Sequence, residues 1–187
     1  FQGLDQLFPW LTIKENIVFA MKSVRKIPKG ASLRDMADKY LDLVDLKDCD
    51  SCYPFELSGG MKQRGSIARA LSVEPKVLLM DEPFGSLDAF SRRAMHRMLM
   101  KVWEKTGTTI IFVTHDIEEA VDLADRVLVF APSRLKADIT NPLGRPRDRD
   151  DQVYRTFLLK VKGFLDGASK DSFKSEGVVS SGVELAF

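Results

Sequence analysis

Long apolar runs are missing from this 187-residue sequence, and so is a clear excess of either charge. No segment approaches the roughly 20 apolar residues that span a bilayer, and no basic start followed by an apolar core suggests a signal peptide. We therefore expect a cytosolic location. Lysine and arginine total 28 against 27 acidic residues, and a net charge of +1 gives no reason to expect a nucleic acid or a bare anionic membrane as partner.

Cysteine and histidine are scarce, with two of each. Cys49 and Cys52 form a lone C-x-x-C, but no second pair and no nearby histidine completes a tetrahedral metal site. We interpret the spacing as chance. The bulk composition is ordinary, because 44% hydrophobic and 29% charged residues suit one globular domain with a sizeable core.

Capping patterns predict two helices near the start of the chain. Thr12 followed by Glu15 has the T-x-x-E form of a capping box, so a short helix should begin after Trp10. Ser32 is the next candidate N-cap, and apolar residues recur at helical spacing from there to about Leu46. The second segment is amphipathic, which indicates that it packs one face against the rest of the domain.

Short apolar runs alternate with helical segments in the remainder of the sequence. Residues 77–80 and 109–113 have the pattern of strands buried on both faces, and residues 127–130 form a third apolar run. A charged helical stretch from about 88 to 105 separates the first two, and a helix beginning near 116 precedes the third. The order strand, helix, strand, helix, strand predicts an α/β fold with a parallel sheet.

Three polar residues follow the first two predicted strands. Asp81 and Glu82 come after the first and His115 after the second, and ligands of parallel sheets bind at the carboxyl ends of strands. A carboxylate at the end of a buried strand is costly unless it holds a cation or accepts several hydrogen bonds, so Asp81 is a candidate magnesium ligand. Side chains alternate along a strand, so Glu82 can orient water instead. Taken alone, the acidic pair could merely cap a loop, and His115 could be structural.

Residues 57–64, with the sequence LSGGMKQR, resemble the LSGGQ-type signature that distinguishes ABC ATPases from other P-loop proteins. The hydroxyl of Ser58 and the amides of Gly59 and Gly60, at a helix N-terminus with its partial positive charge, suit a phosphate. A flexible turn that caps a helix would explain the serine and the first glycine. It would not explain why the same chain carries the acidic pair and the histidine in order.

Further elements of the ABC ATPase family occur in the same order. Gln2 resembles the Q-loop glutamine, residues 86–88 the D-loop, and residues 114–116 the switch-histidine segment, so the resemblance spans about residues 1–149. It implies a P-loop NTPase-like, mostly parallel sheet flanked by helices, with an inserted helical subdomain at about residues 12–75.

The resemblance also implies roles in the hydrolysis of ATP with Mg²⁺, by in-line phosphoryl transfer to water. Asp81 and Gln2 would help to bind the metal, and Gln2 would link this site to the transporter. Glu82 would polarise the attacking water, and His115 would contact the γ-phosphate.

The implied partners follow from how this family assembles. Two ATPase domains face head to tail, so Ser58, Gly59 and Gly60 would close over nucleotide held by a second ATPase subunit, and Asp88 would stabilise that dimer contact. A transmembrane permease subunit and, indirectly, a solute-binding protein complete the assembly. The chain would then lie as a peripheral subunit on the cytoplasmic face of the cell membrane.

One family element has no counterpart here. No glycine is followed by lysine, so the Walker A loop G-x-x-x-x-G-K-[ST] cannot occur. In the family that loop precedes the Q-loop, which is where this sequence begins, with Phe1 in place of methionine. We therefore expect an N-terminally truncated chain that is inactive by itself. Residues 1–150 would be a partial ATPase domain, and residues 151–187 a C-terminal helix and flexible tail.

Two short segments point to the transported solute. Residues 7–12 (LFPWLT) and 144–147 (GRPR) resemble importers of nitrate, sulfonate or taurine. The aromatic residues of the first segment form either an exposed surface for the membrane subunit or an ordinary core loop. The arginines at 145, 147 and 149 alternate with prolines and acids, which favours a solvated connector over an anion site.

Two other classes of protein compete with the importer. A soluble ABC protein usually carries both ATPase domains on one chain, whereas this sequence has one signature, one Asp-Glu pair and no internal repeat. A non-catalytic regulator or remnant would need a chain that truly starts at Phe1, and the opening in the middle of a domain argues against it. The importer is therefore the favoured interpretation.

Overall fold

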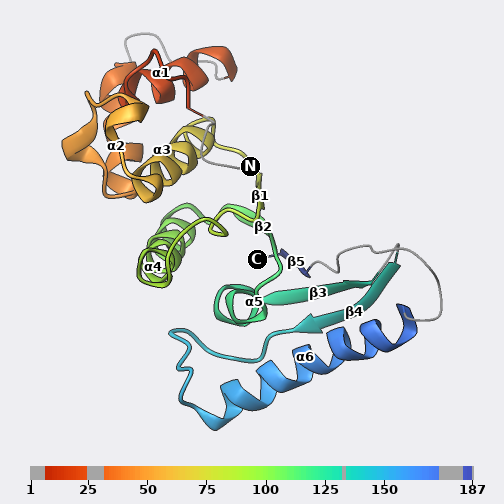
Figure 1. The fold of residues 1–187 in the computed structure, drawn as a ribbon. Coiled ribbons are helices and arrows are strands. Elements are labelled where there is room, and N and C mark those ends of the chain that lie inside the picture. The colour runs from red at the N-terminus through yellow and green to blue at the C-terminus, as the bar shows by residue number, and fades with distance from the viewer. Residues whose placement is uncertain (1–6, 25–31, 132–133, 173–182, 187) are drawn as a thin grey trace. The chain divides into compact units, whose positions relative to one another are not determined.

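The computed structural model, drawn as a ribbon in Figure 1, describes residues 7–24, 32–131, 134–172 and 183–186. The chain divides into two compact units, Phe1–Leu78 with Pro83–Thr109 and Leu79–Glu82 with Ile110–Phe187. Helices form the first unit, and a sheet with two helices forms most of the second. The architecture is therefore mixed α/β, as the alternation of apolar strands and helical segments predicts.

In the described residues of the first unit, four α-helices and two short 3₁₀ segments are present. Their bounds are α1 (Ile13–Val24), α2 (Leu33–Leu43), η1 (Lys47–Cys49), η2 (Pro54–Glu56), α3 (Gly59–Leu71) and α4 (Ala89–Thr106). The predicted capping box of α1 is confirmed, because the Thr12 amide donates to Glu15 Oε2 at 2.9 Å and the Glu15 amide donates to Thr12 Oγ1 at 3.2 Å. The Ser32 side chain caps α2, as predicted, by accepting from the Asp35 amide.

Helices α1, α2 and α3 pack against one another around a common core (Figure 1). Gly65 lies in the middle of α3 and is buried. A Cβ atom at this position would meet Ile13 Cδ1 and Leu7 Cδ1, both at 3.4 Å, which is the short end of ordinary van der Waals contact. Helix α3 therefore packs against Leu7 and the start of α1 at this glycine, a residue of low helix propensity.

The sheet contains five strands in the order β1-β2-β5-β3-β4. The strands and the two helices that accompany them are β1 (Val77–Asp81), β2 (Thr109–Thr114), α5 (Ile117–Leu123), β3 (Arg126–Ala131), β4 (Arg134–Thr140), α6 (Gln152–Ser172) and β5 (Val183–Ala186). Strand β5 pairs antiparallel with both β2 and β3, and β3 pairs antiparallel with β4. Strands β2 and β3 consequently run in the same direction without being neighbours.

The prediction of a mostly parallel sheet is therefore wrong for the pairs around β3. It missed β4 and β5. Strand β4 carries Arg134, Lys136 and Asp138 and is largely exposed, so it has no apolar run to reveal it. Strand β5 is four residues long and lies in the segment that we expected to be a tail. Short or polar edge strands give little signal in a single sequence.

Strand β1 differs from expectation in its burial. Leu78 and Met80 are buried, but Val77 and Leu79 are 49% and 54% exposed. The apolar run is thus covered on one face, and the prediction of burial on both faces is wrong for this strand. Helix α6 packs along β3 and β4 (Figure 1), and Tyr154, Phe157 and Val161 are among its buried side chains.

None of the helices in the described part of the chain is both long enough and apolar enough to cross a bilayer.

Candidate functional site

Glu82 and His115 lie in contact at the end of β1 and β2. Oε1 of Glu82 is 3.0 Å from Nδ1 of His115. The backbone also joins the two strands here, because the Glu82 amide donates to the Val113 carbonyl at 2.9 Å. The two strands therefore present their carboxyl ends at the same edge, where both side chains are largely exposed to solvent.

The contact fixes how the histidine ring can be used. Where Glu82 is ionised it only accepts hydrogen bonds, and His115 then donates to it from Nδ1. Nε2, on the other side of the ring, can face a ligand, and it donates to an anion only when the ring is protonated on both nitrogens. A carboxylate held by an imidazole at an exposed strand end can also orient a water molecule. The pair thus places the Glu82 carboxylate, which can accept a proton from water, beside the His115 ring, which can contact an anion.

The backbone turns sharply at Glu82. Its φ angle is +41°, in the left-handed region that non-glycine residues rarely occupy. Such a conformation costs about 1–3 kcal/mol and persists only where the surroundings enforce it. Here it ends β1 immediately after Asp81, so two consecutive carboxylates leave the strand at a change of backbone direction.

Asp81 is half-buried, and its carboxylate makes no hydrogen bond or ion pair with any other described residue. Mg²⁺ prefers oxygen ligands and is commonly bound through one or two carboxylates together with phosphate oxygens and water. An unpartnered carboxylate beside Glu82 fits that kind of site. Within the described ranges there is no group of three or more His, Cys, Asp or Glu side chains that could hold a metal by themselves.

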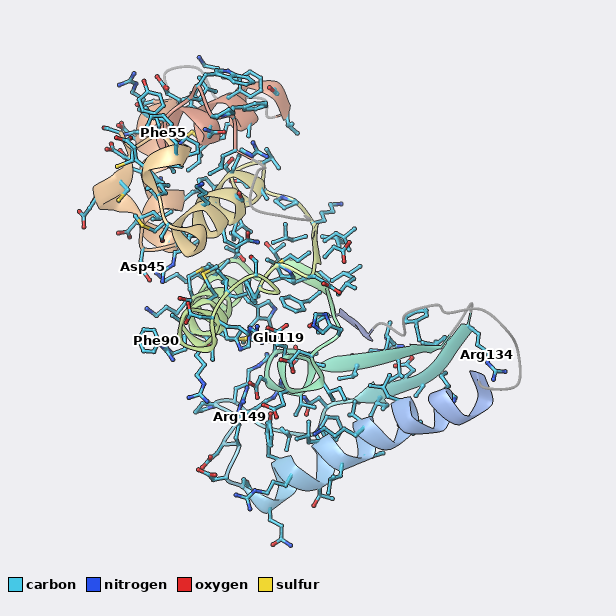
Figure 2. The ribbon with its side chains drawn as sticks, in the orientation of Figure 1. Asp45, Phe55, Phe90, Glu119, Arg134 and Arg149 are labelled. Carbon is cyan, nitrogen blue, oxygen red and sulfur yellow. The ribbon has the colours of Figure 1, made fainter. Side chains whose placement is uncertain are left out.

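Residues on both sides of His115 anchor its backbone. Thr114 Oγ1 donates to the buried Glu119 Oε2 at 2.7 Å and accepts from the Asp116 amide at 3.0 Å. The Asp116 carboxylate caps α5 by accepting from the amides of Glu118 and Glu119. His115 is thus held at a rigid junction between β2 and α5, and Figure 2 shows Glu119 on that helix.

The signature residues lie in the first unit. Ser58 is the N-cap of α3 and its hydroxyl accepts from the Met61 amide at 3.4 Å, while Gly59 and Gly60 open the helix. A Cβ atom at Gly60 would meet nothing within 4 Å, so this stretch of backbone is open to approach. Since α3 has no acidic residue in its first turn, nothing there opposes the positive end of the helix dipole.

Asp88 also has a structural role in the first unit. Its carboxylate caps α4 by accepting from the amides of Phe90 and Ser91 at 2.9 and 3.0 Å and from the Ser91 hydroxyl at 2.6 Å. The hydrogen bond from the Ser91 hydroxyl, followed by that from the Ser91 amide, lowers the pKa of the Asp88 carboxyl. The remaining predicted site residue, Gln2, lies outside the described residues.

Asn16 is a residue that the sequence reasoning missed. It is fully buried, and its amide group holds the segment that precedes α1. Nδ2 donates to the carbonyls of Phe8, Leu11 and Thr12 at 3.2, 3.1 and 3.0 Å, and Oδ1 accepts from the Phe8 amide at 2.8 Å. The available signal was a polar residue three positions after Ile13 in a predicted helix, which is the spacing of neighbours on one helical face.

The segment that Asn16 holds presents aromatic surface. Trp10 is 70% exposed, and its ring lies 5.4 Å from that of Phe8. The guanidinium of Arg69, on α3, lies 5.4 Å from the centre of the Phe8 ring. Of the two interpretations left open, an exposed surface and an ordinary core loop, the exposure of Trp10 favours the first.

The arginines at 145, 147 and 149 are not the solvated connector that we expected. The Arg147 side chain is only 3% exposed and the Arg145 side chain is 20% exposed. All three bind groups on or just after α5, and Figure 2 shows Arg149 close to that helix.

The cysteines remain without a role. Cys49 and Cys52 are free thiols in the turn around η1. The interpretation of their spacing as chance stays a prediction.

Known proteins resemble this chain over most of its length. The sequence profile of the ABC transporter family matches residues 1–85. The aliphatic sulfonates import ATP-binding protein SsuB of Bacillus thuringiensis is 42% identical over 158 residues, which cover 83% of this chain and 61% of that protein. The nitrate import ATP-binding protein NrtD of Synechocystis is 43% identical over 159 residues, covering 82% of this chain and 57% of that protein.

A solved structure shares the fold. It is a dimeric, post-hydrolysis state of an ATP-binding cassette bound to ADP and Pi, with a TM-score of 0.63 and 30% sequence identity. The match covers 77% of this chain and 62% of the solved one. The chain thus spans about three fifths of the length of the relatives that it matches.

Proposed function

Since the chain belongs to the family of ABC transporter ATP-binding proteins, we propose that it carries the hydrolytic residues of an ATPase subunit that drives an importer. The observation that carries this proposal is the 3.0 Å contact between Glu82 and His115 at the shared end of β1 and β2. It brings a candidate general base and a candidate phosphate contact to the edge where α/β sheets bind ligands.

The reaction is transfer of the terminal phosphoryl group of ATP to water. Glu82 orients the attacking water and accepts its proton, and His115 keeps Glu82 in place through Nδ1 while its other ring nitrogen faces the γ-phosphate. Asp81 supplies a carboxylate for Mg²⁺, with Gln2 as a second ligand. When bound, the metal neutralises charge on the phosphate oxygens.

The other predicted residues serve the assembly of the transporter. Ser58, Gly59 and Gly60 contact nucleotide held by a second ATPase subunit, and Asp88 adds to that dimer contact while capping α4. Support comes from the open backbone at Gly60 and from the dimeric cassette that shares this fold. The subunit binds a transmembrane permease on the cytoplasmic face of the membrane and responds indirectly to a solute-binding protein.

The finer fold assignment and the solute belong to the same proposal. A P-loop NTPase-like sheet with a helical subdomain at about residues 12–75 underlies the ATPase domain, with a C-terminal helix after residue 150. The solute is nitrate, a sulfonate or taurine. Support for this class comes from relatives named for aliphatic sulfonates and for nitrate, each more than 40% identical.

The test uses the product of the complete reading frame that contains this chain. Hydrolysis of Mg²⁺-ATP is measured for the unsubstituted protein and for Glu82→Gln and His115→Ala. Each substitution should lower kcat by about 100-fold or more, because each removes a group that acts in proton transfer or charge stabilisation. Glu104→Gln, which makes the same chemical change on an exposed position of α4, should leave the rate unchanged.

Two results would contradict the proposal. An unsubstituted protein without ATPase activity would exclude hydrolysis altogether. A normal rate of hydrolysis by Glu82→Gln would support ATPase activity but would show that Glu82 is not a catalytic residue. Solute specificity is tested separately, by solute-stimulated ATPase activity in proteoliposomes with the permease and binding protein.

A further inference from the structure

Helix α5 follows His115 directly and is poorly equipped to hold itself in place. It has seven residues, two acids in its first turn and no basic residue in its last turn. Short isolated helices are marginal in water, and their last carbonyls need donors from elsewhere. The position of α5 therefore depends on contacts that other segments provide.

The segment before α6 provides those contacts through an arginine clasp, which we define as Arg145, Arg147 and Arg149. Nη1 of Arg147 donates to the Val121 carbonyl at 2.8 Å, and Nη2 of Arg145 donates to the Leu123 carbonyl. Both carbonyls belong to the last turn of α5, at the negative end of its dipole. Two cations thus donate to two of the carbonyls in the last turn, and Asn141 Nδ2 also donates to the Val121 carbonyl at 3.0 Å.

Carboxylates around α5 complete the clasp. Arg149 Nη1 lies 2.6 Å from Glu118, and Arg149 also pairs with Asp122. Arg145 lies 2.9 Å from Asp125, immediately beyond the helix. Asp122 additionally accepts a 2.6 Å hydrogen bond from the hydroxyl of Tyr154 on α6. The clasp therefore grips the side of α5 as well as its end.

Arg147 is the costly member of the clasp. Burial, and then the neighbouring charge of Arg145, lower the pKa of its guanidinium to about 10. A buried ion pair is weak evidence for stability, because desolvation offsets much of the attraction between the charges. The guanidinium of Arg147 instead provides directional hydrogen bonds, because its donors lie in one plane in a fixed fork geometry. Its expected contribution is therefore to the placement of α5.

The other end of α5 connects directly to the site. The Asp116 cap and the hydrogen bond from Thr114 to Glu119 tie the first turn of the helix to the residues on both sides of His115. We propose that Arg147, supported by Arg145 and Arg149, is a positioning residue that fixes α5 and thereby holds His115 against Glu82. The catalytic consequence rests on the proposed function, whereas the geometric one does not.

The geometric arm uses NMR of this chain. It has two histidines, so the imidazole signals of His115 are assigned with a single His115→Gln spectrum. Glu82→Gln should shift those signals, because it changes the acceptor at Nδ1. When the protein also carries Arg147→Met, adding Glu82→Gln should not shift the His115 imidazole signals. Arg126→Met, which removes an exposed pair with Asp138 in the same unit, should preserve the full response.

Conservative variants separate placement from simple loss of stability. Arg147→Lys keeps the charge but not the fork, so it should restore only part of the response. If Arg147→Met does not fold, Arg149→Met replaces it, since that side chain is more exposed and holds the same helix. A full His115 response to Glu82→Gln in either clasp variant would overturn the proposal, even where the midpoint temperature of unfolding falls.

The catalytic arm uses the product of the complete reading frame. Arg147→Met should lower kcat by roughly tenfold with little change in KM for ATP, because a misplaced group impairs the chemical step more than binding. Added to His115→Ala, it should have almost no further effect. An additive effect would overturn the proposal. Absence of ATPase activity in the unsubstituted protein would contradict the proposed function, and the NMR response would still decide the role of the clasp.

Discussion

Asn16 in the first unit and the arginine clasp in the second both hold a backbone segment by donating hydrogen bonds to its carbonyls, but they use different chemical groups. Asn16 donates to the carbonyls of residues 8, 11 and 12, and the clasp donates to the carbonyls of residues 121 and 123. Asn16 is neutral and completely buried, and its amide both donates and accepts. The clasp uses cations, which need carboxylates nearby.

The difference shows how burial limits the choice of side chain. A neutral amide can be buried without the desolvation cost of an ion, provided that its hydrogen bonds are made. A guanidinium offers more donors and a fixed fork, but its charge has to be balanced. The Asn16 segment is therefore expected to be rigid and insensitive to salt, whereas the clasp is expected to respond to it.

The largest effect should come from Asn16→Asp. The oxygen that replaces Nδ2 would face three carbonyl oxygens in a fully buried position, and only the other oxygen would keep a donor, the Phe8 amide. We expect the free energy of unfolding to fall by about 3–5 kcal/mol at neutral pH. The loss should shrink as the pH falls, because burial raises the pKa of the new carboxyl and protonation removes its charge. Urea denaturation at two pH values measures both, and a loss under about 1 kcal/mol would contradict the description of Asn16.

Asn141→Asp is the matched change in the second unit and should cost less. The Asn141 amide donates to the carbonyls of Val121 and Ala124 at 3.0 and 2.9 Å, beside the clasp. The nearby cations Arg145 and Arg147 partly compensate the introduced charge, so we expect a loss of about 1–3 kcal/mol. Denaturation under the same conditions gives the comparison. Equal losses for the two variants would show that the clasp cations do not stabilise a nearby carboxylate.

Salt should distinguish the two regions with a smaller effect. Raising the ionic strength from about 0.05 to 1 M shortens the screening length from roughly 14 to 3 Å, which weakens partly exposed ion pairs such as Arg149 with Glu118. Hydrogen exchange should then accelerate a few-fold for the amides of α5. The Phe8 amide, which donates to Asn16, should keep its protection. Equal acceleration at both places would argue against an electrostatic clasp.

Asp88 extends the comparison to a fully exposed side chain and should give the smallest effect. Its folded-state pKa is lowered, so its contribution to stability is present above the unfolded-state pKa and is lost as the pH falls through the folded value. Asp88→Asn keeps a capping acceptor and should remove this part of the acid sensitivity without unfolding α4. Thermal unfolding between about pH 2 and 6 measures the difference between the two proteins. Identical pH profiles would exclude a role for the ionised cap.

Local patterns predicted the elements that carry the candidate site. The caps at Thr12, Ser32 and Ser58 begin helices where expected, and the apolar runs before Asp81 and His115 form strands. These features depend on residues close together in sequence, so one sequence contains the necessary information. The roles assigned to the site residues come from family resemblance and remain predictions.

Long-range pairing was beyond local patterns. Strand β5 joins residues 183–186 to strands about 55 to 75 positions earlier, and no periodicity in a four-residue strand reveals that. The same limit explains the arginine clasp. Arg147 and its acceptor on Val121 are 26 positions apart, and alternation with prolines and acids is also typical of exposed linkers.

The sequence by itself indicated the resemblance to ABC ATPases, the alternation of helices and strands as far as β3, and the residue types at the ends of β1 and β2, because motifs and short-range spacing carry all three. Only the tertiary structure decided that Glu82 and His115 touch, that Asn16 holds a loop, and that three arginines bind α5. Each of these depends on which distant groups share a buried or strained environment, and the energy of a hydrogen bond or charge depends on that environment more than on the residue itself.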